Sequence, residues 1–388
     1  MIVIGPDGEE FGRLQFPWGE AGSVTPSEAC SFVFQSLEQI LAGPVEPVAG
    51  VPTHAASTYD GFLVDGKGNA QGTIQVKVGK SNARTGKASV KATVLLADGT
   101  KKSLKAAGNG KVKFSADGPT TVALSGGEAC SLTLDADGFL GSYGVHVAEG
   151  VRNYLASTDA DELAAADEAV GKWLGPVNVS WDGGSLGVML AKKGKAKVKG
   201  TLADGKTKVA VNTQFLFGET WSCVPVVAPN AKLAFLLWFL SDGRTARAEG
   251  LSEKVYVGRP GALASDATFH VSTDAADWSA ISGKVLTDYL PDGVKVTPRG
   301  TKWVLPKAGK VAYKDGAADA SKLLDNPSAL KLTYKAADGS FKGSFKVYAE
   351  VNGKPKATTV NVTGYLVDGV GHGSATIWGK FSVPVTIR

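Results

Sequence analysis

One β-hairpin unit recurs along this chain, and the recurrence constrains the fold more than any other feature of the sequence. Two copies are closely similar, namely residues 72–80 and 86–99 (GTIQVKVGK, GKASVKATVLLADG) and residues 184–192 and 194–205 (GSLGVMLAK, GKAKVKGTLADG). A more degenerate third copy lies within residues 343–364, and the hairpin that follows it, GYLVDGVG, echoes GFLVDGKG at residues 61–68. Supersecondary units are duplicated because neighbouring copies pack together, so the repeat predicts an architecture and not an activity.

The composition indicates a folded chain made of many short strands. The 388 residues are 43% hydrophobic and 20% charged, which suits two or three ordinary domains and excludes a wholly disordered protein. Glycine is abundant at 49 residues without a collagen period, and Asp-Gly occurs thirteen times. Asp-Gly favours tight hairpin turns of type I′, in which both central residues have positive φ.

These patterns predict a mostly β fold. We expect antiparallel β-meanders that form sandwich-like or barrel-like repeat units, with a few accessory helices. The apolar run at residues 233–240 predicts a buried strand, and the alternating residues 381–388 predict a last strand whose Pro384 suits an edge. Start signals and apolar spacing predict helices over residues 26–42, 159–173, 273–290 and 317–324.

The repeat also suggests how the chain is divided. Residues 1–51 form a lead segment with one helix. Residues 52–258 form a β domain built of two related units, at about 52–155 and 156–258. The sequence VGRPG at residues 257–261 reads as a linker, and residues 259–388 form a C-terminal helix-plus-β domain that carries the third repeat.

Catalytic and metal-binding patterns are missing from the sequence. The four histidines are far apart and none lies in an HExxH spacing, and neither a GxSxG elbow nor a Walker A loop occurs. Three cysteines, Cys30, Cys130 and Cys223, show no CxxC spacing. We therefore predict no catalytic residue, metal site or cofactor. One enzymatic alternative stays open, a site assembled from residues far apart in the chain.

Lysines and tryptophans supply the candidate binding residues. Lys195, Lys197 and Lys199 alternate with small apolar residues, so in a strand all three project from one face, and Lys77 and Lys91 belong to the first copy of the repeat. Such a face suits an anionic polymer, although lysines also keep strands soluble and protect strand edges. Trp181 and Trp378 lie beside glycine turns and could stack on a sugar ring, whereas most tryptophans serve the core.

The GxLVDGxG hairpins and the segment from Leu330 to Gly364 carry a family resemblance. They resemble the tandem Gly- and Lys-rich β repeats near the C-terminal ends of large, mostly uncharacterised bacterial surface or secreted proteins. The resemblance covers about residues 55–388 and implies a structural or adhesive module at an extracellular or cell-surface location. It supplies no catalytic residues. The segment after Met1 has neither the basic start nor the apolar run of a signal peptide.

Three functions follow from these patterns. The first is a non-catalytic, repeat-built module that contacts itself or another protein, and the second is a module that binds a glycan or another polyanion. The third is the enzyme with a dispersed site. A net charge of +5 is small for a dedicated nucleic-acid binder, so we do not expect a nucleic-acid partner. The longest apolar run is far shorter than a membrane-spanning helix, so we expect no membrane span.

Overall fold

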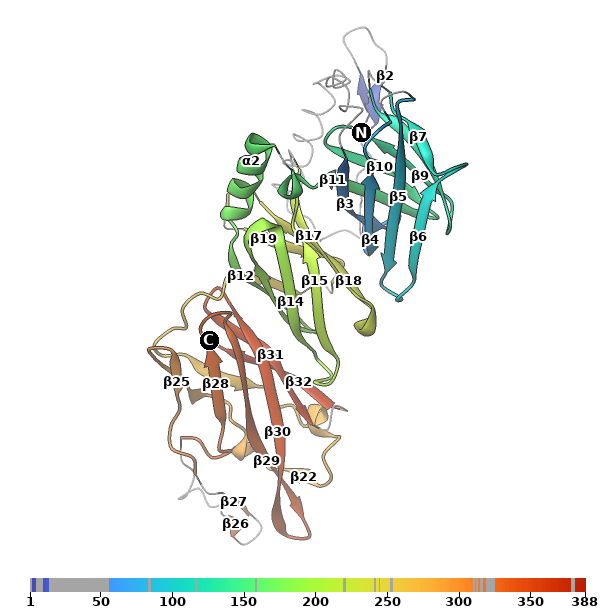
Figure 1. The fold of residues 1–388 in the computed structure, drawn as a ribbon. Helices are drawn as coiled ribbons and strands as arrows, with labels where there is room; N and C mark the ends of the chain where they lie inside the picture. The colour runs from blue at the N-terminus through green and yellow to red at the C-terminus, as the bar shows by residue number, and fades with distance from the viewer. Residues whose placement is uncertain are drawn as a thin grey trace.

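The structure, a computed structural model, consists of three β units in a row (Figure 1). We call them the barrel (residues 57–152), the middle unit (residues 175–258) and the C-terminal unit (residues 268–387). The residues that the structure describes are 2–4, 10–13 and 56–388, without 83–84, 116–117, 158, 219–220, 241, 244, 252–253, 310, 312, 315–316, 319–324 and 378–380. The predicted helix at residues 26–42 lies outside them.

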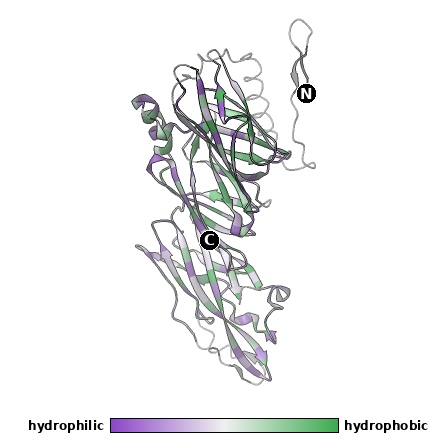
Figure 2. Cartoon of the chain, turned by 45° about the vertical axis from the view of Figure 1, so that its right-hand side comes forward, coloured by the Kyte–Doolittle hydropathy of each residue, from purple (hydrophilic) through white to green (hydrophobic). Residues whose placement is uncertain are grey.

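The barrel is a closed ring of eight antiparallel strands in the order β4-β3-β11-β10-β9-β8-β6-β5, because β5 also pairs with β4. Its strands are β3 Ser57–Val64, β4 Ala70–Val78, β5 Lys87–Leu96, β6 Lys101–Ala106, β8 Thr120–Ser125, β9 Cys130–Leu134, β10 Gly138–Tyr143 and β11 His146–Arg152, with β7 Lys111–Lys113 beside the start of β5. Alternate residues such as Ile74 and Val76 fill the interior. Figure 2 shows this alternation of apolar and polar residues along many strands.

The middle unit has two sheets that share one core. The first sheet, in the order β15-β14-β13-β12-β20, contains β12 Gly175–Trp181, β13 Gly184–Leu190, β14 Lys195–Leu202, β15 Lys208–Gln214 and β20 Val255–Gly258. The second contains β16 Leu216–Phe217, β17 Ser222–Ala228, β18 Leu233–Phe239 and β19 Ala246–Glu249. The predicted strand at 233–240 is confirmed as β18.

One α-helix, α2, lies among the described residues, and it flanks the middle unit (Figure 1). It spans Ala160–Gly171 and begins at Asp159, whose carboxylate accepts the main-chain N–H groups of residues 161 and 162. Val170 and Trp173 are buried in the core of the middle unit. The predicted helix at residues 159–173 is therefore confirmed.

The C-terminal unit is a curled sheet in the order β22-β29-β30-β31-β32-β21-β23, with β28 beside β29. The strands are β21 Thr268–Val271, β22 Lys284–Val285, β23 Val294–Lys295, β28 Lys331–Lys335, β29 Ser340–Val351, β30 Lys354–Val367, β31 Val370–Ile377 and β32 Phe381–Ile387. Separate pairs join β1 Ile2–Ile4 to β2 Glu10–Arg13, β24 Thr297–Arg299 to β25 Lys302–Val304, and β26 Tyr313–Lys314 to β27 Ala317–Ala318. The mostly β prediction, with sandwich-like or barrel-like units, is confirmed.

The repeated hairpins have the same register in the barrel and the middle unit. In β4–β5, Gly72 pairs with Leu96. In β13–β14, Gly184 pairs with Leu202 at the equivalent position. The degenerate third copy also forms a hairpin, β29–β30. The predicted repeat unit is confirmed as an antiparallel hairpin.

A second repeated motif was not recognised in the sequence. β9–β10 and β28–β29 share a register, and each places a phenylalanine, Phe139 or Phe341, opposite a glycine of the next strand. A Cβ atom on Gly150 would lie 2.3 Å from the Phe139 ring, and one on Gly364 would lie 2.4 Å from the Phe341 ring. Glycine is required at both positions because the ring occupies the space of a side chain.

The predicted helix at residues 273–290 is wrong. Two 3₁₀ turns, Ala275–Trp278 and Thr287–Tyr289, flank Lys284–Val285, which pairs with β29 as a short strand. Gly283 has φ of +99°, which breaks a helix at that point. Trp278 is buried as its spacing predicted, so burial inside an irregular segment produced the helical spacing.

Two further predictions, the helix at 317–324 and the edge position of the last strand, need correction. The predicted helix at 317–324 begins as strand β27 at Ala317–Ala318, and residues 319–324 lie outside the described part of the chain. The last strand, β32, lies between β31 and β21 and is not an edge strand. Pro384 pairs with β31 just beyond the end of β21, so its missing N–H group faces no second partner.

The Asp-Gly turns mostly differ from the predicted type. Among the described Asp-Gly pairs, Asp368–Gly369 has positive φ at both residues, whereas at residues 98–99 and 204–205 only the glycine does. There the aspartate carboxylate accepts main-chain N–H groups two or three residues on, which stabilises the alternative turn.

Within the described ranges, no helix has the length and hydropathy that crossing a bilayer requires.

Candidate functional site

Three lysines form a row across the outer wall of the barrel. Lys77 on β4 pairs directly with Lys91 on β5, and Lys91 pairs directly with Lys105 on β6. All three side chains are exposed. Neighbouring strands are about 4.8 Å apart, so three ammonium-bearing side chains start within about 10 Å of one another. We call this set the lysine row.

Three more lysines form a stripe along β14. Lys195, Lys197 and Lys199 are exposed, while the residues between them, Ala196 and Val198, are buried in the core of the middle unit. Alternate residues of a strand are about 6.7 Å apart, so the stripe runs about 13 Å along the sheet. The predicted common face of these three lysines is present, and we call it the lysine stripe.

Two stripe lysines, Lys195 and Lys197, line a hollow of about 1000 Å³ between the barrel and the middle unit, and the lysine row lies next to its barrel wall. The barrel contributes three uncharged polar residues and one lysine, which are Thr73, Gln75, Thr93 and Lys101. The middle unit contributes two lysines of the stripe and two amide side chains, which are Lys195, Lys197, Asn212 and Gln214. Gln75 and Thr93 each lie two positions from a lysine of the row, on the same outer face of the barrel. We call this hollow the basic groove.

The stripe continues into a smaller cleft of about 200 Å³ between the middle and C-terminal units. Lys197 lines both hollows, and Lys199 and Lys335 line the cleft. The fully buried Asn178 also lines it and donates through Nδ2 to the main-chain carbonyls of Asp338, at 3.0 Å, and Leu366, at 2.7 Å. Its Oδ1 atom is buried and has no hydrogen-bond partner among the described residues.

The charges of these lysines are not neutralised within the described part of the chain, where none of the row or stripe lysines forms an ion pair. A carboxylate does line the groove, that of Asp60. It accepts from the Gln75 side-chain amide at 2.7 Å and from the Asn153 amide at 2.9 Å. The groove is therefore positively charged.

The predicted tryptophans do not join the lysines. Trp181 ends β12, and its half-buried ring lies 6.4 Å from the ring of Phe235 and close to Gly183. Trp378 lies outside the described residues. Lys77 and Lys91 come together across β4 and β5, and Lys105 joins them through a pairing register that is not visible in the sequence.

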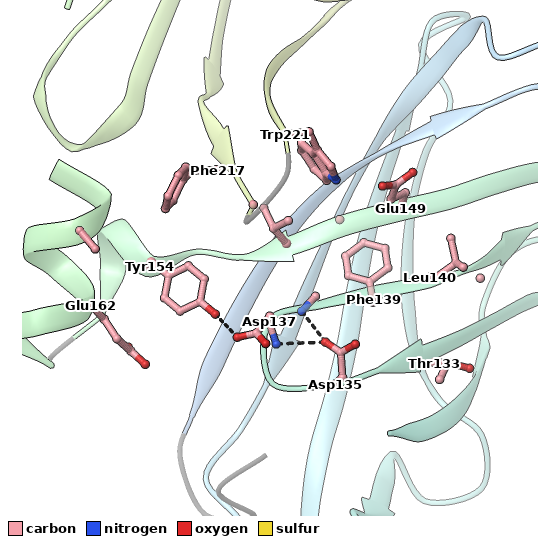
Figure 3. A pocket seen from close by; sticks show the side chains of 16 residues that line it. Thr133, Asp135, Asp137, Phe139, Leu140, Glu149, Tyr154, Glu162, Phe217 and Trp221 are labelled. Carbon is pink, nitrogen blue, oxygen red and sulfur yellow. Dashed lines mark hydrogen bonds between the residues drawn. The ribbon is translucent and has the colours of Figure 1, made fainter. Parts of the chain in front are cut away.

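A second hollow of about 850 Å³ lies on another part of the barrel wall (Figure 3). Its floor is a row across β9, β10 and β11, formed by Thr133, Leu140 and Glu149. Phe217 and Trp221 of the middle unit and Tyr154, just after the barrel, form the aromatic walls. The carboxylates that line it are Asp135, Asp137, Glu149 and Glu162, and no lysine or arginine is among the described lining residues. We call this hollow the acidic pocket.

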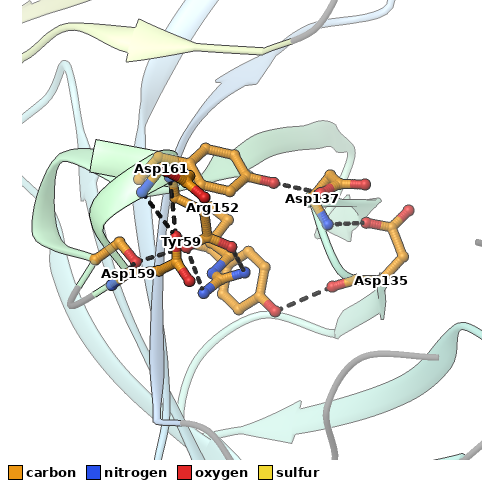
Figure 4. Close-up of polar contacts among 9 residues, drawn as sticks. Tyr59, Asp135, Asp137, Arg152, Asp159 and Asp161 are labelled. Carbon is orange, nitrogen blue, oxygen red and sulfur yellow. Dashed lines mark hydrogen bonds and ion pairs between the residues drawn. The ribbon is translucent and has the colours of Figure 1, made fainter. Parts of the chain in front are cut away.

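A polar network fixes one side of the acidic pocket (Figure 4). The Tyr154 hydroxyl donates to Asp137, and the Asp135 carboxylate accepts the main-chain N–H of residue 137 at 3.0 Å. The Tyr59 hydroxyl donates to the main-chain carbonyl of Asp135 at 3.0 Å, and burial raises the pKa of Tyr59 to about 12. Burial also raises the pKa of Tyr154, so both phenols stay protonated and act as donors.

The remaining carboxylates of the pocket differ in their partners. Glu162 on α2 forms two hydrogen bonds with the Arg152 guanidinium, at 3.0 and 3.1 Å. Glu149 has no such cation among the described residues. Burial raises the pKa of Glu149, and a hydrogen bond with the Trp221 side chain acts in the opposite direction. Nothing in the sequence indicated this pocket, because its residues come from three separate segments.

The barrel and the middle unit are held together by an apolar junction. The rings of Phe62, Trp221 and Trp238 meet edge to face with centroids 5.7 to 5.8 Å apart. Cys223 is fully buried beside them. Such aromatic packing holds the barrel wall and the middle-unit wall of the basic groove and of the acidic pocket in fixed positions.

Comparison with known proteins adds no assignment, since no family model, curated protein or solved structure matches this chain. Within the described ranges, no group of three or more histidine, cysteine, aspartate or glutamate residues is placed to hold a metal ion. The basic groove and the acidic pocket are therefore the candidate sites.

Proposed function

We propose that the chain is a non-catalytic β module that binds an acidic polysaccharide along the lysine row, the basic groove and the lysine stripe. The observation that carries the proposal is the direct pairing of Lys91 with a lysine on both sides. Like charges directly opposite each other in a sheet destabilise it, so this arrangement lowers stability unless an anion lies on it.

The alternative reason for lysines in strands, protection of a sheet edge, does not apply to them. β4, β5 and β6 each have partners on both sides in the closed barrel, and β14 lies between β13 and β15. Solubility alone is served as well by lysines interspersed with acidic residues. Four lysines without an ion pair in the lining of the groove and its continuation, with the lysine row beside them, are better explained by a negatively charged ligand.

The groove chemistry favours a polysaccharide over a nucleic acid. The lining of the groove contains no aromatic residue among the described ones, and single-stranded nucleic acids are bound largely by stacking bases on aromatic rings. It contains lysine and no arginine, the residue that recognises phosphate and bases with two hydrogen bonds. Hydroxyls and amides such as Gln75, Asn212 and Gln214 suit sugar hydroxyl groups.

A direct test measures binding of the full chain to polygalacturonate and heparin, with dextran and single-stranded DNA as comparisons, by calorimetry at low and high salt. We expect the acidic polysaccharides to bind and their affinity to fall as salt rises. Replacing Lys77, Lys91 and Lys105 together with glutamine should weaken binding about tenfold or more, at about 0.5 kcal/mol or more for each charge.

A matched control removes three exposed lysines elsewhere, with Lys331, Lys354 and Lys356 of the C-terminal unit changed to glutamine. We expect this variant to bind nearly as well as the parent chain. Equal losses in the two triple variants, or no binding to either acidic polysaccharide, would contradict the proposal. Tighter binding of DNA than of both acidic polysaccharides would show that the ligand class is wrong.

Contact with another protein or with a second copy of the chain is the second candidate function. The β10–β11 hairpin exposes three apolar side chains, Leu140 at 59%, Val145 at 88% and Val147 at 42%. Apolar side chains grouped in this way mark interaction surfaces. Light scattering tests self-association directly, and Val145→Ser with Val147→Ser should reduce any oligomer to the mass of one chain. An oligomer unaffected by both changes would exclude this hairpin as the contact.

A further inference from the structure

We propose that the acidic pocket binds a small organic cation, an ammonium group carried on an apolar body. The proposal is independent of the lysine row, since the pocket lies over β9 to β11 and the basic groove lies over β3 to β6. The size of the pocket, its aromatic walls and the sign of its charge support it.

The pocket has the size of a small-molecule site. Its volume of about 850 Å³ falls within the range of cavities that hold small ligands. The barrel supplies the floor, and the middle unit and α2 supply the walls (Figure 3). The aromatic junction beside Trp221 fixes the distance between floor and walls, so the cavity is preformed and does not require closure on a ligand.

The apolar side chains of the pocket suit the body of such a ligand. Leu140 stands on the floor and remains 59% exposed, although it lies in the middle of the cavity. Phe217 and Trp221 present their rings from the facing wall. Covering these surfaces with an apolar group removes them from water, which is favourable by about 25 cal/mol for each Å² of apolar surface.

The charge of the pocket selects a cation. Four carboxylates line it and no lysine or arginine lines it among the described residues, and Arg152 compensates only Glu162. Glu149 ends the floor row beside Leu140, and it forms a hydrogen bond with the Trp221 side chain. Carboxylates and aromatic rings in one cavity suit an ammonium group, because the charge and the ring quadrupole both attract a cation.

The environment of Glu149 supports the same reading. A partly buried carboxylate without a cationic partner is less stable than one in water. Burial accordingly raises the pKa of Glu149. A bound ammonium group would stabilise the ionised form, and an anionic ligand would be repelled by the same carboxylates.

The test compares three ligands of similar shape on the full chain by calorimetry: phenethylammonium, the neutral 2-phenylethanol and the anionic 3-phenylpropanoate. We expect the cation to bind about tenfold or more tightly than the neutral alcohol, a difference of about 1.4 kcal/mol, and the anion not to bind. Equal affinity for the cation and the alcohol would overturn the proposal. Absence of binding by phenethylammonium, choline and spermidine alike would overturn it as well.

Two variants locate the cation. Glu149→Gln keeps an oxygen that accepts the Trp221 hydrogen bond but removes the charge, and Asp137→Asn does the same opposite Tyr154. Each should weaken phenethylammonium binding at least about fivefold without lowering the thermal midpoint of the chain. Glu128→Gln, an exposed acid outside the pocket, is the control and should change nothing. Unchanged binding in both pocket variants, or an equal loss in the control, would refute the assignment.

Discussion

Replacing Lys91 with glutamine should stabilise the barrel, although it removes a residue that we place in the binding surface. Lys91 faces Lys77 on one side and Lys105 on the other, and its neighbours along β5 on the same face are Ser89 and Thr93. At about 7 Å in water, each pair of ammonium groups repels by about 0.6 kcal/mol before screening. Removing the central charge relieves both pairs, so the gain is about 1 kcal/mol at low salt.

The expected gain depends on salt in a defined way. The Debye length falls from about 30 Å at 0.01 M to about 3 Å at 1 M, so the gain should fall to about 0.1 kcal/mol in concentrated salt. Amide hydrogen exchange in the full chain gives the free energy of opening for β4, β5 and β6 at both salt concentrations. A domain of this size would show the low-salt gain as a rise of about 4 °C or more in its melting temperature.

A matched control separates repulsion from the ordinary effect of glutamine in a strand. Lys346 is exposed in the middle of β29, pairs with Thr359 and has Ser344 and Tyr348 beside it on the same face. Lys346→Gln should therefore leave the exchange of β29 and β30 unchanged within a few tenths of a kcal/mol. If Lys91→Gln gave no larger gain than this control, or a gain that salt did not reduce, the lysine row would carry no electrostatic cost and the main argument for a bound polyanion would fail.

Three further outcomes follow from the packing and the pKa shifts. Burial raises the pKa of Cys130 to about 11 and that of Cys223 well above its usual value, so iodoacetamide at pH 8 should modify these two thiols only after unfolding, as peptide mapping would show. Gly150→Ala forces a methyl group against the Phe139 ring and should cost about 1–3 kcal/mol in urea unfolding, part of which Phe139→Leu should recover. Burial lowers the pKa of His372, so the folded chain binds fewer protons at this residue than the unfolded chain does. The free energy of unfolding should therefore fall as pH drops below the ordinary histidine pKa of about 6.5. His372→Gln should remove this dependence of the free energy of unfolding on pH between about pH 7.5 and pH 5.

The local part of the fold could be predicted from the sequence because strand and turn patterns are short-range. The hairpins β4–β5 and β13–β14 follow from two-residue alternation and from the turns between them. The closure of the barrel could not be predicted in this way. It depends on β11 pairing with β3, which joins residues about 90 positions apart, and no local pattern specifies that pair or its register.

The same distinction explains which site residues were found. The lysine stripe lies on one strand, so alternation alone placed its three members on one face. The acidic pocket joins Glu149 on β11, Glu162 on α2 and Trp221 before β17, and only the packing of the barrel against the middle unit brings them together. The error at residues 273–290 has a related cause, because buried residues of an irregular segment such as Trp278 and Tyr289 recur at helix-like intervals without a helix.

The small net charge of +5 hides a separation of charge that decides how the two hollows can work together. Lysines occupy the wall over β4 to β6 and the stripe on β14, while carboxylates occupy the pocket over β9 to β11. An acidic polymer on the basic groove is repelled by the pocket, and an organic cation in the pocket is repelled by the lysines. At physiological salt the Debye length of about 8 Å screens each ligand from the other site, so the ligands should neither compete nor cooperate. Measured competition between polygalacturonate and phenethylammonium at this salt concentration would contradict the separation of the two sites.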